Sequence, residues 1–184
     1  MIRRCILIAT VLTVITLVTI ANDQEAQSNT ENVAQATSIV EARSRAKMLH
    51  ELVCGTLQIM HRDFFDEDNA HAIPSASLED VFHEMGDSYD VKMKWLIINT
   101  DVVNVDHEPE TPFEKDAVKL LAAGKPFAEH TTSNRYHFAG PIRLGSQCLK
   151  CHVKRRTSNE DRTAGLVITM PLRSELPTAA STAD

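Results

Sequence analysis

The longest continuous pattern in the chain is a segment from about Val33 to Phe65 that contains no proline and a single glycine. Apolar residues recur in it at intervals of three and four, the spacing of one face of an α-helix. They are Ile39, Ala42, Ala46, Leu49, Val53, Leu57, Met60 and Phe64. A long amphipathic helix must bury such a stripe against another layer, so the rest of the chain has to supply elements that cover it.

The remaining elements alternate between strand and helix patterns. Ser77, with an acidic residue three positions later, predicts a capped start for a short helix that runs through Met85. Pro112 suits a first helical turn and Gly124 a helix stop, which predicts a helix between them. Strands rich in aromatic and branched residues are predicted over 91–98, 135–144 and 164–172. This order predicts an α+β domain with an antiparallel sheet.

Residues 1–21 have the composition of a targeting segment. Arg3 and Arg4 precede an unbroken apolar or hydroxyl-bearing run from Cys5 to Ala21, as in the charged and apolar regions of a secretory signal. Small residues at its end allow cleavage after Ala21. The run also lies at the short end of the roughly 17 to 25 residues that cross a bilayer, so a retained membrane anchor is the alternative. Either way, we expect a periplasmic protein or one anchored to face the periplasm.

The rest of the chain divides by composition. Residues 22–34 form a polar linker, residues 35–172 a single domain, and residues 173–184 a polar tail that we expect to be frayed. The formal net charge is −6. Because nucleic-acid binding normally needs a basic face, this acidity argues against a nucleic-acid partner.

Cys148, Cys151 and His152 form a C-x-x-C-H motif, the pattern of covalent haem c attachment. Two thiols three positions apart on one turn can reach both vinyl groups on one edge of the porphyrin, and the adjacent imidazole is then brought beneath the iron. Without Cys5, the chain has three cysteines. An odd number in an oxidising compartment favours a use of sulfur other than disulfide pairing. The motif therefore predicts one covalent haem with His152 as the proximal ligand.

Two other uses of the motif remain open. A redox dithiol or disulfide would be expected at the start of a helix in a βαβ unit, which the predicted elements do not form. A zinc site with four protein ligands would need a second pair of cysteines or histidines, and the sequence has none at such spacing.

Any sixth ligand of the iron must come from elsewhere, and the long helix is the best source. His50, Cys54 and His61 lie within about 40° of one another on a helical wheel, beside the apolar stripe. His61 is the first candidate, because imidazole commonly ligates low-spin iron. Arg62 follows it and could pair with a haem propionate. Cys54 ranks second, and the alternative is that it is a small buried apolar residue.

The other histidines are expected to be less useful as ligands. His71, His83, His107 and His130 lie in or beside polar segments and should be solvated. His137 alternates with Tyr136 and Phe138 on a predicted strand, so it should face away from the side that those two bury.

The chain resembles the c-haem-binding domains of PAS-like fold found in bacterial periplasmic cytochromes and in the sensor portions of signalling proteins. The resemblance rests on residues 138–143 (FAGPIR) before the C-x-x-C-H motif, on residues 165–172 (GLVITMPL), and on a long helix followed by residues 73–75 (IPS). It covers most of residues 35–172 and implies a PAS-like antiparallel sheet with short flanking helices. Val153 departs from the pattern, since glycine often follows the haem histidine in this family.

The resemblance implies a haem-based redox or ligand sensor, with a periplasmic carrier of single electrons as the alternative. Both roles imply a redox or signalling protein partner. Fold analogy alone does not establish either role. No nucleophile with a positioned base stands out in the sequence, so we expect no enzymatic activity.

Overall fold

The computed structural model describes residues 35–66, 73–146, 148–153 and 157–173. The predicted targeting segment 1–21 and linker 22–34 lie outside the described residues, as does the predicted tail beyond Arg173. The chain divides into two units, Met1–Gln35 and Ala36–Asp184, and the second is described here. Within the described ranges, no helix has the length and apolar character needed to cross a membrane.

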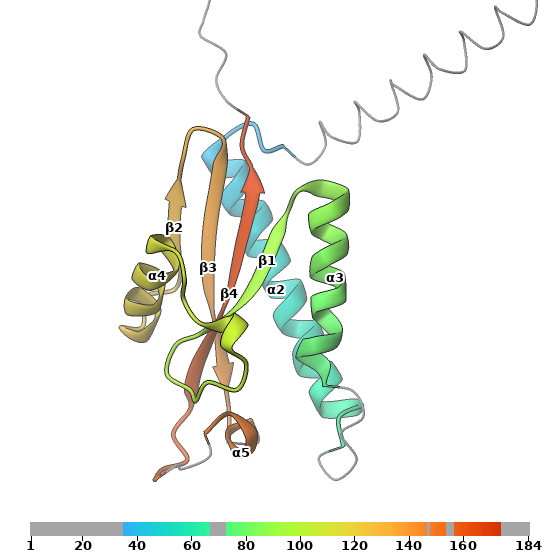
Figure 1. The fold of residues 1–184 in the computed structure, drawn as a ribbon, viewed down its shortest axis with the longest axis vertical. Helices are drawn as coiled ribbons and strands as arrows, with labels where there is room; N and C mark the ends of the chain where they lie inside the picture. The colour runs from blue at the N-terminus through green and yellow to red at the C-terminus, as the bar shows by residue number, and fades with distance from the viewer. Residues whose placement is uncertain (1–34, 67–72, 147, 154–156, 174–184) are drawn as a thin grey trace, which may run out of the picture. The chain divides into compact units, whose positions relative to one another are not determined.

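The centre of the domain is one antiparallel sheet of four strands in the order β1-β4-β3-β2 (Figure 1). The strands are β1 (Lys92–Ile97), β2 (Ala128–Thr131), β3 (Arg135–Leu144) and β4 (Arg162–Pro171). The helices are α2 (Ile39–Asp63), α3 (Pro74–Tyr89), the 3-10 helix η2 (Val105–His107), α4 (Pro112–Ala122) and α5 (Leu149–His152). The α+β class predicted from the sequence is confirmed, and each of the three predicted strands is observed.

The two faces of the sheet pack against different helices. Tyr136, Phe138 and Ile142 of β3 belong to the larger core cluster, which includes residues of α2 and α3. Ala139 of β3 and Val167 of β4 belong to a smaller cluster with α4. Since side chains alternate along a strand, the even-numbered residues of β3 face α2 and the odd-numbered ones face α4.

α2 follows the predicted amphipathic pattern in its middle but not at its ends. Ala42 and Ala46 are fully buried, which lets the helix backbone approach the sheet closely. Ile39 and Phe64, both predicted to be on the buried stripe, are 43% and 80% exposed. The prediction was wrong for these two residues because the first lies in the opening turn of α2 and the second at its C-cap.

An ion-paired hydrogen-bond network ties α2 to the sheet. Nε and Nη2 of Arg43 donate to the two carboxylate oxygens of Glu129 on β2, at 2.7 and 2.6 Å. The hydroxyl of Tyr136 on β3 donates to the same carboxylate at 2.6 Å. The bond from Arg43, followed by that from Tyr136, lowers the pKa of Glu129 against the opposing effect of burial. Burial, and then the Glu129 carboxylate, raise the pKa of Tyr136.

The helices α3 and α4 begin with proline. α4 starts as predicted: Pro112 occupies its first turn, Thr111 and Glu114 form a reciprocal capping box, and Gly124 follows its end with a φ of 79°. α3 starts earlier than predicted, at Pro74. Ser77 does not cap it, and its hydroxyl donates instead to the carbonyl of Ile73 within the first turn.

Candidate functional site

The C-x-x-C-H motif forms the short helix α5 and the residue before it. Cys148 is the N-cap of α5, and its carbonyl accepts from the backbone N–H of His152 at 3.1 Å. The Cys148 thiol is partly buried and the Cys151 thiol is exposed, and neither is in a disulfide. Leu149 between them is fully buried in the larger core cluster and so anchors the turn.

His152 lies at the meeting point of three segments that are distant in the sequence. The loop after β1 contacts it, since the backbone N–H of Asp101 donates to the His152 carbonyl at 2.9 Å. Burial lowers the pKa of His152, and the charges of His61 and His107 lower it further. The histidines of the last turn of α2 and of η2 are therefore near enough for their charges to act on the imidazole of the motif.

His61 presents one ring nitrogen to the protein backbone. Its Nδ1 lies 3.1 Å from the carbonyl of Leu57, so Nδ1 must carry the hydrogen and donate. The Nε2 atom then holds the lone pair. The ring of Phe65 lies beside it, with centroids 5.4 Å apart. A backbone carbonyl that fixes the tautomer is the usual second contact of a metal-bound histidine.

Cys54 and His50 lie further back along α2 and are buried. Cys54 is two turns from His61, which corresponds to about 10 Å along the helix axis. Its Sγ lies 3.5 Å from Nε2 of His50, and both residues are 8% exposed. Burial, with a smaller effect of the Glu51 carboxylate, raises the pKa of the Cys54 thiol to about 12. Cys54 belongs to the same core cluster as Leu149.

Arg62, proposed from the sequence as a propionate partner, points into solvent. Its side chain is 70% exposed and forms a two-bond ion pair with the adjacent Asp63, at 2.7 and 3.0 Å. This pairing raises the pKa of Arg62 and lowers that of Asp63.

His107 is the site residue that the sequence did not reveal. It was expected to be solvated, but its side chain is only 21% exposed, and its Nε2 lies 2.9 Å from Glu79 Oε1 on α3. Asn104 caps η2 through the N–H of Asp106 at 3.0 Å. An Asn two residues before an acid is a local turn signal that could have shown this segment to be ordered.

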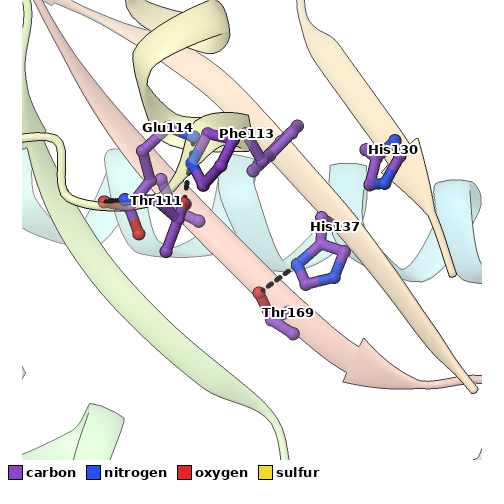
Figure 2. Close-up of a pocket in the computed structure, with 8 residues that line it drawn as sticks. Thr111, Phe113, Glu114, His130, His137 and Thr169 are labelled. Carbon is purple, nitrogen blue, oxygen red and sulfur yellow. Dashed lines mark hydrogen bonds between the residues drawn. The ribbon is translucent and has the colours of Figure 1, made fainter.

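A separate cavity of about 300 Å³ lies on the α4 face of the sheet (Figure 2). His130 and His137 line it together with Thr169, Phe113 and residues at the start of α4. As the strand alternation predicted, His137 faces away from the side on which Tyr136 and Phe138 are buried. His83 and His130 are exposed, as expected, and His71 lies outside the described residues.

Clusters of three or more His, Cys, Asp or Glu residues arranged to hold a metal ion are absent from the described residues. A haem iron takes no more than two ligands from the protein, so this absence does not bear on the motif.

Comparisons with known proteins agree on one family. The family model described as Tll0287-like matches residues 19–167. A solved structure described as that of the cyanobacterial haem protein Tll0287 is similar, with a TM-score of 0.50 and 13% sequence identity. The match covers 75% of this chain and 97% of that one. At this identity the likeness concerns the fold alone. No curated protein matches the chain.

Proposed function

The chain belongs to the Tll0287-like family, and from that membership we propose that it holds one haem c covalently through Cys148 and Cys151, with His152 as the proximal iron ligand. The observation that carries the proposal is α5, a single turn with a free thiol at each end of a C-x-x-C sequence and an imidazole next to the second. The related solved structure is described as a haem protein, which supports the same cofactor.

The chemistry of these residues fits haem attachment. The exposed Cys151 thiol is accessible to a reacting vinyl group, and the partly buried Cys148 borders the apolar core cluster that could cover the porphyrin. His152 has a lowered pKa, which keeps its imidazole neutral and able to bind iron. When bound, haem would supply one-electron redox chemistry and a site for a small ligand at the iron.

For the distal iron ligand we propose His61, with Cys54 as the second candidate. His61 is favoured by its nearness to His152 and by the Nδ1 contact with Leu57, which leaves Nε2 free to bind a metal. Cys54 would have to lose a proton that burial holds strongly, although a coordinating metal removes such protons. Arg62 could reach a propionate by exchanging its present partner, Asp63.

A sensor of redox state or of a small ligand is the role we favour, on a PAS-like domain. The supporting feature is α2, which carries both candidate distal ligands in its C-terminal half and is tied near its start to β2 and β3 through Arg43 and Glu129. A change at the iron would act on this helix and on its packing against the sheet. The alternative role is electron transfer between partners outside the cytoplasm.

We propose a non-enzymatic role. Cys54 and His50 have the residue types of a nucleophile and its base, at 3.5 Å. Both are buried, however, and the thiol has a raised pKa, whereas a catalytic cysteine needs a lowered one and access to substrate.

Attachment is tested with cysteine variants of the full chain. Cys148→Ser and Cys151→Ser should each lose one thioether bond, and the double variant should release haem into acid-acetone. Cys54→Ala is the matched control, since it removes a cysteine outside the motif and should keep the covalent haem. Intact mass is the measurement, and a native protein without the mass increment of haem would overturn the proposal.

Export is tested separately. Replacing the apolar run 5–21 with polar residues should leave apoprotein with free thiols in the cytoplasm, because haem of this type is attached outside it. Full haem incorporation in that variant would contradict a periplasmic location.

The two roles are separated by absorption spectra of the oxidised and reduced protein, with and without carbon monoxide. A shift of the reduced bands on adding carbon monoxide would support a ligand sensor. Sharp bands indifferent to carbon monoxide would support an electron carrier with two strong axial ligands.

A further inference from the structure

Two histidines face each other across the β2–β3 ladder, on the α4 face of the sheet. His130 and His137 are direct partners in the antiparallel register. Their ring centroids are 6.0 Å apart, with an angle of 31° between the planes. Two imidazoles on one tetrahedral zinc ion have centroids about 5 Å apart, since each Zn–N bond is about 2.0–2.1 Å and each ring nitrogen lies roughly 1.1 Å from its ring centre. The two rings therefore need to approach each other by only about 1 Å to share an ion.

We propose that His130 and His137 form a binding site for a divalent transition-metal ion such as Zn²⁺ or Cu²⁺, with solvent completing the coordination. Imidazole nitrogens are the common protein ligands of these ions.

The contacts of the His137 ring hold it in an orientation and tautomer that suit metal binding. Its Nδ1 lies 3.0 Å from the hydroxyl oxygen of Thr169 on β4, as Figure 2 shows. With the N–H of Nδ1 donating to this hydroxyl, Nε2 carries the lone pair, and the ring is held in one orientation. Phe113 packs beside both imidazoles, with centroid distances of 5.5 Å to His137 and 6.4 Å to His130.

The lining of the cavity contains one carboxylate, that of Glu114. The Glu114 carboxylate adds negative charge to the lining of the cavity, although Lys94 pairs with it at 3.3 Å.

This site is independent of the proposed haem site. The two histidines face α4, whereas Leu149 of the C-x-x-C-H motif is buried in the core cluster on the opposite face of the sheet. A metal at His130 and His137 would therefore bind whether or not haem is attached.

The experiment titrates full-length protein with haem attached and no purification tag. Isothermal titration with Zn²⁺ alone at pH 7.5 should detect one ion per chain. His130→Ala and His137→Ala should each weaken binding strongly. Thr169→Val should weaken it by about tenfold through loss of the contact that orients His137, and Thr169→Ser should restore it. His83→Ala, which removes an exposed histidine on α3, should bind like the native protein.

Cu²⁺ provides an independent readout, because its electron paramagnetic resonance spectrum should show two imidazole nitrogens in the native protein and one in His130→Ala. Zn²⁺ binding of equal strength in native protein and in His130→Ala would overturn the proposal, as would no binding to the native protein. If His137→Ala fails to fold, the proposal is tested by His130→Ala and by the comparison of Thr169→Val with Thr169→Ser. His130→Ala should fold because it removes an exposed side chain, and Thr169→Ser should fold because it keeps the hydroxyl. Loss of zinc binding in a chain that carries no haem would refute the independence of the two sites.

Discussion

The imidazole of His50 occupies the space where Gly140 has no side chain. A Cβ atom added at Gly140 would lie 2.4 Å from Nε2 and 2.5 Å from Cδ2 of His50. The ring also meets Phe138 edge to face, with centroids 5.8 Å apart. α2 and β3 can therefore pack at their observed separation only because residue 140 is glycine.

Gly140→Ala should destabilise the protein by about 1–3 kcal/mol, the usual cost of overpacking a core. Chemical denaturation measures the effect. Gly55→Ala is the control, because its added Cβ would meet no atom within 4 Å beyond the neighbouring residues and backbone of its own helix, and alanine in a helix interior is favoured by about 0.5–1 kcal/mol. The cost of Gly140→Ala should shrink in a His50→Ala background. Equal costs in the two backgrounds would show that the ring is not what the added methyl group meets.

Tyr136→Phe should cost about 1.5–3 kcal/mol, because it removes a hydrogen bond to a charged carboxylate and leaves Glu129 with one partner fewer. Thermal or chemical unfolding gives the value. Tyr89→Phe on α3 removes the hydroxyl of a tyrosine that is 40% exposed and should change stability by less than about 0.5 kcal/mol. A similar small change in Tyr136→Phe would mean that Arg43 alone holds Glu129.

Glu41→Gln should make the stability of the domain less dependent on acid. The carboxylate accepts from the backbone N–H and hydroxyl of Thr37, at 2.7 and 2.6 Å, and these bonds lower its pKa. A lowered pKa in the folded state contributes stability that is present above the unfolded value of 4.5 and is lost as the pH falls through the folded value. Unfolding curves measured between pH 7 and pH 3 should be flatter for this variant. Glu84→Gln, at an exposed position on α3, should keep the native slope.

His61→Ala should open the sixth coordination position of the haem, turn the spectrum partly high-spin and raise the affinity for carbon monoxide while the haem stays attached. His83→Ala is the matched control and should leave the spectrum unchanged. Cys54→Ser should produce these changes only if the thiolate is the ligand, and the reduction potential should then rise. Native spectra in the His50, Cys54 and His61 variants alike would exclude α2 as the source of the ligand.

The features that the sequence revealed depend on signals between neighbouring residues. Pro112 predicted the start of α4 and Gly124 its stop, and each signal is a single residue of the sequence. The C-x-x-C-H motif is equally local, so its residues could be found without knowing the fold. β2 was not predicted, because Ala128–Thr131 has no apolar alternation and is a strand only through its pairing with β3.

The features that the sequence did not reveal depend on contacts between distant segments. His107 looked like a loop residue, and only its contact with Glu79, 28 positions earlier, shows that it is ordered. The burial of His50 could not be predicted either, since its ring fills the space left by the missing side chain of Gly140 on β3. Phe64 has the helical spacing of the buried residues but is exposed, because the spacing does not show where α2 extends beyond the core.

The strand order has a consequence for the route by which the domain folds. β4 lies between β1 and β3, yet among the strands of the described residues it is the last to be synthesised. β1 pairs only with β4, so it has no partner in the sheet until residues 162–171 exist. The segment before α2 is also fixed late, because the backbone of Ala36 forms hydrogen bonds with Pro171 and Arg173. Contacts this far apart in sequence make folding slow, and the sheet cannot be completed before β4 has been synthesised.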